Sequence, residues 1–197
     1  MQDEGIALYR RFLDGDEQAL EALISLYRRG LLRFIYGYVH DEALAEDLLQ
    51  ETFVALYFRR TFKERGDASF KTYLYKVARN KSLNAIKKRK RKKEVSLEAI
   101  TDDSPSQESE LQAFVYGADA HETIEEKERR QAVQRALLRL KAEYREVIIL
   151  RYFDDLSPER IAQITKRKTK QVYNLLARGK TALKEELETE GVGYENG

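Results

Sequence analysis

The sequence contains no cysteine and only two histidines, His40 and His121, among its 197 residues. Without cysteine there is no disulfide, and two separated histidines do not make a Cys/His zinc site. We therefore expect neither a metal nor another cofactor. Long apolar runs are also missing, and the N-terminus lacks the basic start and apolar core of a secretory signal. These absences predict a cytoplasmic protein that does not insert into a membrane.

Residues that break helices are equally scarce. Only two prolines, Pro105 and Pro158, and ten glycines interrupt the chain, which favours long helices over a strand-rich fold. Charged residues make up 36% and hydrophobic residues 42% of the sequence, so packed helices rather than global disorder are expected. The length permits two domains of about a hundred residues each.

The net charge of +2 is divided unevenly along the chain. Residues 1–93 carry 20 basic against 13 acidic side chains, and residues 129–187 carry 15 against seven. Between them, residues 94–128 carry one lysine against 11 acids. Two basic blocks around an acidic one indicate two surfaces for a polyanion, although ordinary solvated helix surface explains the charge equally well.

Apolar residues recur at helical spacing through most of the first block. They predict two helices over residues 6–35, a third from about Asp41 with acids in its first turn, and a fourth from about Phe70. The fourth helix ends in seven consecutive basic residues, 87–93. Residues 62–69 predict a loop before it.

A polar and acidic stretch over residues 94–123 marks a domain boundary, and helical periodicity resumes at Ile124. The predicted fold class is all-α. Two helical domains, residues 1–93 and 124–187, are joined by a flexible acidic linker and followed by a tail, residues 188–197.

The C-terminal domain contains the pattern of a helix-turn-helix. Ser157 is suited to cap a short helix that has Pro158 at its first position, where the missing amide costs nothing. A polar gap at residues 166–168 follows, and a longer helix starts near Thr169. The small side chain of Ala162 allows this second helix to cross closely, and the second helix is the one that enters the major groove.

Polar side chains near the start of the longer helix are the candidate contacts to duplex DNA. Amides read adenine edges, whereas lysine and arginine contact phosphate or guanine. The candidates are Lys168, Lys170, Gln171, Tyr173, Asn174 and Arg178. The alternative to a DNA-binding motif is a helical hairpin whose charged face is simply exposed to solvent.

Three side chains of the predicted third helix, Asp47, Gln50 and Glu51, have the i, i+3, i+4 spacing that places them on one helix face. An acidic and amide face is a poor surface for DNA and suits a basic protein partner better. When such a triplet stands alone, it more often indicates an ordinary solvent-exposed helix face.

Aromatic and basic residues alternate in the segment that follows. Phe62, Phe70, Tyr73 and Tyr75 lie among Lys71, Lys76, Arg79 and Lys81. Aromatic faces stack on unpaired bases while cations follow the backbone, so this composition suits an opened DNA strand. The alternative is that the aromatic residues form core, which we expect for Phe70 and Leu74.

The order of these segments resembles the extracytoplasmic-function (ECF) sigma factors, the small promoter-specificity subunits of bacterial RNA polymerase. DEALAEDLLQETFVALY at 41–57 and FKERGDASFKTYLYKVARN at 62–80 are similar to consecutive motifs of that family's first domain, and LSPERIAQI at 156–164 follows at the family's distance. The resemblance covers about residues 20–90 and 125–187. It implies a factor that directs promoter-specific transcription initiation and is not an enzyme.

The resemblance also implies roles for particular residues. The face with Asp47, Gln50 and Glu51 docks on a coiled coil of the largest polymerase subunit. The minus-ten element is captured by a loop and opened by the helix after it, through Arg65, Gly66, Asp67, Ser69, Lys71, Tyr73, Lys76 and Asn80. The helix-turn-helix binds the minus-thirty-five element as duplex. The implied partners are core polymerase, at its coiled coil and flap region, promoter DNA and an anti-sigma factor.

The sequence departs from the family's pattern at several positions. Tyr73 stands where a tryptophan is usual, and it is still able to stack. In the helix-turn-helix connection, Thr165, Lys166 and Arg167 replace a Leu-Gly pair and an apolar residue, which predicts a looser turn or a different backbone conformation. The recognition helix differs as well, so no promoter sequence follows from the resemblance.

Three other functions fit parts of the sequence. A stand-alone helix-turn-helix regulator leaves the aromatic and basic segment at 62–93 unexplained. A metal-dependent nuclease would use carboxylates such as Glu46, Asp47 and Glu51, but these lie on one helix without histidine or a second carboxylate cluster. The third is a pure protein-interaction module, such as a polymerase-binding decoy.

Overall fold

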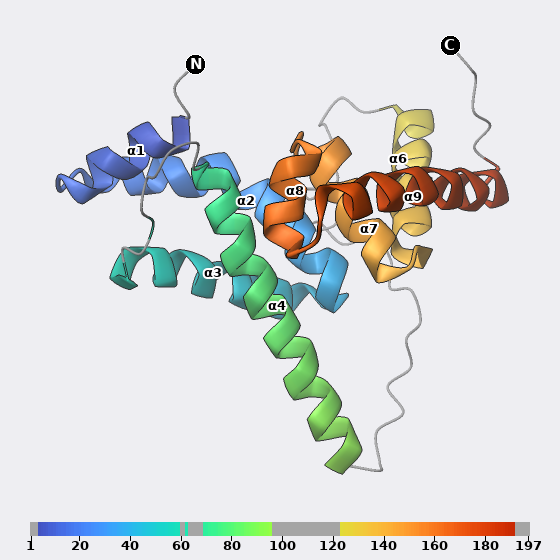
Figure 1. Ribbon diagram of the computed structural model, residues 1–197, viewed down its shortest axis with the longest axis horizontal. Coiled ribbons are helices and arrows are strands. Elements are labelled where there is room, and N and C mark those ends of the chain that lie inside the picture. Colours follow the sequence, from blue (N-terminus) through green and yellow to red (C-terminus); the bar gives the residue numbers. More distant parts are fainter. Residues whose placement is uncertain (1–3, 60–61, 63–68, 96–122, 192–197) are drawn as a thin grey trace. The chain divides into compact units, whose positions relative to one another are not determined.

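The computed structural model describes residues 4–59, 62, 69–95 and 123–191 (Figure 1). Within these residues every regular element is a helix, and the chain divides into two compact units. The first is built on helices α1–α4 and the second mainly on helices α6–α9. The predicted all-α fold with two helical domains is confirmed, and the predicted linker lies almost wholly outside the described residues.

The N-terminal unit begins with α1 (Glu4–Leu13) and α2 (Glu17–Val39). Asp16 caps α2 by accepting a hydrogen bond from the Ala19 N–H at 3.2 Å, which satisfies one of the free donors at the helix start. Arg11 donates to the same carboxylate at 2.7 Å, and this hydrogen bond lowers the pKa of Asp16 below its ordinary value. One side chain thus anchors the turn between the two helices.

Helices α3 (Glu42–Arg59) and α4 (Phe70–Val95) complete this unit and pack on α2. Asp41 precedes α3, and its carboxylate accepts a hydrogen bond from the Leu44 N–H at 3.0 Å. Both helix starts are where the sequence predicts them. The core side chains that are 1% exposed or less include Leu23, Leu31, Phe34, Leu56, Phe70, Leu74 and Tyr75.

The C-terminal unit begins with α6 (Ile124–Arg139), whose first turn is closed by a capping box. The Glu126 N–H donates to the Thr123 hydroxyl at 3.2 Å, and the Thr123 N–H donates to the Glu126 carboxylate at 2.8 Å. The chain continues into α7 (Ala142–Ile148) and a π-helical turn, η1 (Ile149–Phe153). The apolar periodicity that runs on from Ile124 in the sequence is thus divided among α6, α7 and η1.

Helices α8 (Pro158–Thr165) and α9 (Thr169–Thr189) form the predicted helix-turn-helix, with Ser157 as the cap of α8. Helix α9 packs on α7 at Gly179, where an added Cβ would lie 3.2 Å from Ile148 Cγ1. That distance is shorter than an ordinary van der Waals contact, so the absence of a side chain at Gly179 lets the two helices approach closely.

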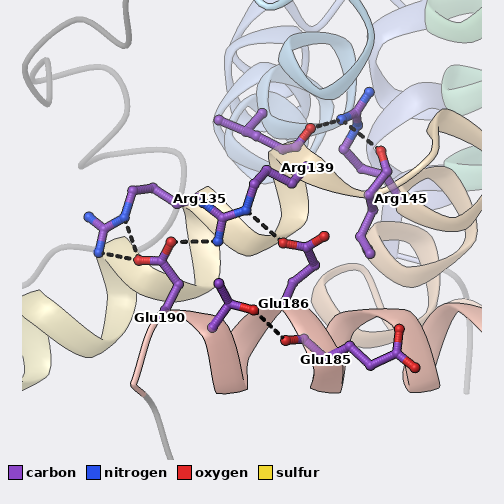
Figure 2. Close-up of polar contacts among 9 residues, drawn as sticks. Arg135, Arg139, Arg145, Glu185, Glu186 and Glu190 are labelled. Atoms are coloured by element: carbon purple, nitrogen blue, oxygen red, sulfur yellow. Dashed lines mark hydrogen bonds and ion pairs between the residues drawn. The ribbon is translucent and has the colours of Figure 1, made fainter.

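Helices α6 and α9 are also joined by an ion-pair cluster near the end of α9 (Figure 2). Arg135 Nε donates to Glu190 Oε2 at 2.7 Å, and Arg139 Nε donates to Glu186 Oε2 at 2.7 Å. Arg139 pairs with Glu190 as well. The hydrogen bond from Arg135 lowers the pKa of Glu190, and the one to Glu186 raises the pKa of Arg139. The end of α9 is thereby held against α6.

Candidate polymerase and DNA interfaces

The outer face of α3 carries the three polar side chains singled out in the sequence. Asp47, Gln50 and Glu51 are all exposed, whereas Leu48 of the same helix is buried. Glu51 accepts a hydrogen bond from Lys81 Nζ of α4 at 2.8 Å, and its side chain is still 61% exposed. The common face that the spacing predicts is confirmed, while its docking on polymerase stays a prediction.

Aromatic rings pack together where α1 meets α4. The ring centroid of Phe70 lies 5.0 Å from that of Tyr9 and 5.1 Å from that of Phe62. Phe62, Phe70 and Tyr75 are 9% exposed or less, and a ring buried in this way presents no face to a base. The core prediction for Phe70 is confirmed, and the stacking interpretation is wrong for Phe62 and Tyr75.

Tyr73 differs from these rings because part of it remains exposed. Its ring centroid lies 5.4 Å from that of Phe62, yet the side chain is only half-buried. Lys76 is half-buried and Asn80 is exposed, and the i, i+3, i+7 spacing puts all three on one face of α4. This face offers a ring, a cation and an amide along about two helical turns.

The remaining minus-ten candidates lie before α4 and in its first turn. Ser69 directly precedes the helix and is half-buried. Lys71 is half-buried, and its Nζ lies 5.9 Å from the centroid of the Tyr75 ring. The candidates that fall outside the described residues are Arg65, Gly66 and Asp67.

The connection of the helix-turn-helix contains a left-handed residue although it contains no glycine. Lys166 has φ 57° and ψ 39°, and its N–H donates to the Ala162 carbonyl. Glycine adopts this conformation freely and is the usual residue after a helix end, whereas a residue with a Cβ is strained there. Lys166 thus adopts the left-handed conformation that suits glycine. A turn that is looser than the family's, or that differs from it in backbone conformation, stays a prediction.

Arg167, at the position where an apolar residue is usual, forms an ion pair instead. Its NH1 donates to Glu146 Oε2 at 2.9 Å, and its NH2 lies 3.7 Å from Glu143 Oε2. The Glu146 side chain is only 4% exposed, so an unpaired carboxylate there would be costly. This pair ties the turn to α7. Sequence reasoning missed it because 21 residues separate Arg167 from Glu146.

The six predicted duplex contacts lie on the exposed side of α9 and at its start, while Val172 and Leu176 are buried. Gln171 Oε1 accepts a hydrogen bond from the Lys168 N–H at 2.9 Å. The side-chain carbonyl of Gln171 thus caps the start of the helix. Bidentate recognition of an adenine needs both the carbonyl and the amino group of an amide, and in Gln171 the carbonyl is already engaged. Asn174, one turn further along, is the better placed amide for a base edge.

Tyr173 stands out from the face of the same helix. It is 55% exposed, and its hydroxyl lies 3.5 Å from a carboxylate oxygen of Glu159 in α8. The exposure predicted for Lys168, Lys170, Gln171, Tyr173, Asn174 and Arg178 is confirmed. Their contact with DNA stays a prediction.

Comparison with known proteins places both units in one family. Family models described as Sigma-70 region 2 and Sigma-70, region 4 match residues 23–92 and 130–183. The ECF RNA polymerase sigma-E factor of Escherichia coli (strain K12) is 30% identical over 158 residues, which covers 80% of each chain. The chain belongs to the ECF sigma factors.

Two further proteins resemble this sigma factor over most of its length. The RNA polymerase sigma-H factor of Pseudomonas aeruginosa is 29% identical over 194 residues, 95% of both chains. The sigma factor RpoE of Bartonella quintana, solved in complex with the anti-sigma factor NepR, matches with a TM-score of 0.66. That match has 21% identity and covers 85% of this chain and 96% of the other, which shows the same fold.

Membership of the family decides between the functions that the sequence left open. The ECF sigma factor binds core RNA polymerase and directs promoter-specific transcription initiation by recognising minus-ten and minus-thirty-five elements. A stand-alone regulator is the wrong interpretation, because the matches include region 2 as well as region 4.

Two of the carboxylates considered for a metal-dependent enzyme, Glu46 and Glu51, have basic partners in the fold. Glu46 accepts a hydrogen bond from Arg28 at 2.6 Å, and Glu51 accepts one from Lys81. Among the residues that the structure describes, no group of His, Asp and Glu side chains is arranged to hold a metal ion. In the same part of the chain, no helix has the length and apolar character needed to cross a membrane.

Proposed function

We propose that the two units of this sigma factor divide the promoter between them. Residues 1–93 act as region 2, which binds core polymerase and recognises and melts the minus-ten element. Residues 124–187 act as region 4, which binds the minus-thirty-five element as duplex. Residues 94–123 connect the two as an acidic linker, and residues 188–197 form the tail.

The docking surface for core polymerase is the outer face of α3. Asp47, Gln50 and Glu51 are exposed side by side there, and a face with two carboxylates and an amide suits a basic partner. The hydrogen bond from Lys81 holds the Glu51 carboxylate in one place, which lowers the side-chain entropy that docking must remove. The partner on polymerase is the coiled coil of its largest subunit, and the flap region is a second contact of the factor.

The minus-ten surface is the face of α4 that carries Tyr73, Lys76 and Asn80. A partly exposed ring can stack on an unpaired base, a lysine can pair with phosphate, and an amide can bond a base edge. Such contacts favour an opened strand over a closed duplex. The other residues of this proposed surface are Arg65, Gly66, Asp67, Ser69 and Lys71.

The minus-thirty-five surface is the exposed side of α9, which carries Lys168, Lys170, Gln171, Tyr173, Asn174 and Arg178. The lysines, Arg178 and the amino group of Gln171 supply donors for phosphate, and Asn174 supplies an amide for an adenine edge. Tyr173 presents a ring edge and hydroxyl beside them.

An anti-sigma factor is proposed as a further partner, because the Bartonella quintana relative with the same fold was solved with one bound. The factor itself is proposed to act in the cytoplasm, where core polymerase and DNA are found. Its work is binding and strand opening, with no catalytic step of its own.

The docking proposal rests on the exposed acidic face of α3, and a charge reversal on that face tests it. Asp47→Lys is expected to weaken binding to core polymerase at least tenfold, because a like charge facing a basic surface repels it. Binding is measured by titrating labelled factor with core enzyme. The matched control is Glu21→Lys, which makes the same change on an exposed position of α2. Equal affinity of the two variants would overturn the assignment of α3.

A further inference from the structure

An acidic side chain lies beside helix α9 in the C-terminal unit. Glu159 is the second residue of α8 and is exposed, and one oxygen of its carboxylate lies 3.5 Å from the hydroxyl of Tyr173 in α9. The backbone N–H of Glu159 and the Ser157 hydroxyl donate to this carboxylate and lower the pKa of Glu159, and the Tyr173 hydroxyl lowers it further. The carboxylate is therefore ionised at neutral pH.

A carboxylate in this place is unexpected for a surface that binds DNA. The exposed side of α9 carries Lys168 and Lys170, which suit phosphates, whereas phosphates repel an anion. DNA that covers Glu159 also removes its water, which is costly unless a hydrogen-bond donor replaces that water. A carboxylate has about four acceptor sites. The three donors within the protein leave room for one more donor, from DNA.

The position of Tyr173 brings the carboxylate to the major groove. Recognition helices contact base edges with their N-terminal residues, and Tyr173 is the fifth residue of α9. A group within hydrogen-bond distance of its hydroxyl therefore lies where base edges are contacted. The major groove presents hydrogen-bond donors only on adenine N6 and cytosine N4. In adenine the acceptor N7 stands beside N6 and repels a carboxylate, so cytosine is the base that suits Glu159.

We propose that Glu159, held by the hydroxyl of Tyr173, accepts a hydrogen bond from the N4 amino group of a cytosine in the minus-thirty-five element. This inference rests on the proposed function, which places α9 in the major groove of that element. It adds a residue of α8 to the proposed surface and names a base that the factor selects. Because the Tyr173 hydroxyl donates to the carboxylate, the tyrosine positions the acceptor.

The test is run-off transcription by holoenzyme from a library of promoters in which both elements are randomised and each template is marked by a barcode in its transcript. Wild type is expected to favour cytosine by about tenfold over the other bases at one position of the minus-thirty-five element. Glu159→Ala is expected to lose this preference. Glu159→Gln is expected to turn it towards adenine, because a side-chain amide donates to N7 and accepts from N6. Tyr173→Phe keeps the ring without the hydroxyl and is expected to weaken the cytosine preference severalfold.

Two controls accompany these variants. Glu185→Gln makes the same change at an exposed position of α9 outside the proposed surface, and it is expected to select the same bases as wild type. The minus-ten element is an internal control, because Glu159 belongs to the other unit. Every variant is expected to keep the minus-ten preference of wild type, which also shows that the variant is folded and bound to core polymerase.

Three results would overturn the proposal. In the first, wild type selects a minus-thirty-five element without cytosine, or both Glu159 variants keep the wild-type cytosine. In the second, the Glu159 variants lower transcription from all templates alike without changing the selected bases, which would mean that the acid only stabilises the start of α8. In the third, Tyr173→Phe selects cytosine as strongly as wild type, so the hydroxyl does not position the acceptor. Absence of any selected minus-thirty-five sequence in wild type would contradict the proposed function instead.

Discussion

Lys166 is one of three residues other than glycine with a positive φ in the described part of the chain. It lies in the helix-turn-helix connection, where the left-handed conformation of an L-residue with a Cβ costs about 1–2 kcal/mol. We expect Lys166→Gly to raise the free energy of unfolding by up to about 1 kcal/mol, since the extra freedom of glycine in the unfolded chain offsets part of the relieved strain. Denaturant unfolding of the full chain measures the change.

The control for this prediction is Lys180→Gly, at an exposed position inside α9. Glycine in a helix interior costs about 1 kcal/mol relative to a good helix former, so this variant is expected to be less stable than wild type. Should Lys166→Gly lower the stability as much as Lys180→Gly does, the left-handed strain assigned to Lys166 would be refuted.

The pair formed by Arg167 and Glu146 leads to a second prediction at this scale. Arg167→Leu is expected to cost about 2 kcal/mol, because it leaves the buried Glu146 carboxylate without this cation. That figure is below the usual loss for a broken buried pair, since the Arg167 side chain is 26% exposed. Adding Glu146→Gln to Arg167→Leu is expected to restore most of the stability, and a double-mutant cycle measures the coupling. Losses that simply add would show that the two side chains do not act together.

Among the elements, the ion-pair cluster between α6 and α9 has a defined pH dependence. Arg135 lowers the pKa of Glu190 in the folded protein. A lowered carboxylate pKa stabilises the fold above the ordinary glutamate pKa of about 4.3, and the contribution disappears as the pH falls through the lowered value. Glu190→Gln is therefore expected to reduce the melting temperature at pH 7, and this reduction is expected to shrink as the pH falls through the lowered value. The loss stays below about 1 kcal/mol, because the Arg135 and Arg139 side chains are 50% and 42% exposed and water screens them.

Glu185→Gln is the matched control, since it removes an exposed carboxylate from the same helix without touching the cluster drawn between Arg135, Arg139, Glu186 and Glu190 (Figure 2). It is expected to leave the pH profile of the melting temperature nearly unchanged. A difference between Glu190→Gln and wild type that persists undiminished at low pH would contradict the assigned role of the cluster.

The helices were largely predictable from the sequence, because their signals are local. Apolar spacing and caps such as Ser157 with Pro158 depend on residues within a turn or two of each other. The sequence did not predict the break between α6 and α7 or the π-helical turn at Ile149–Phe153, because the apolar pattern runs through both. No local signal reports whether a backbone hydrogen bond closes four or five residues back.

For the molecule as a whole, the polar residues singled out on α3 and α9 are exposed, whereas on α4 Tyr73 and Lys76 are half-buried and Asn80 is exposed. What sequence reasoning missed are contacts between distant residues. In the sequence, Arg167 stood out only because it departs from the family's pattern, and its ion pair was not predicted. Glu190, which the sequence assigns to the tail, pairs with Arg135 across 55 residues. In the same way, Phe62 and Tyr75 looked suited to stacking until their burial was known.

The central claim is that this ECF sigma factor directs promoter-specific initiation, with its first unit on the minus-ten element and its second on the minus-thirty-five element. Run-off transcription on a promoter library, with purified core polymerase and the full chain, tests it most directly. The prediction is that transcripts with defined starts arise from the subset of templates that share two sequence elements at a fixed spacing, and that core enzyme alone yields none of them. Transcription that does not depend on the factor, or that depends on it without any shared elements, would contradict the claim.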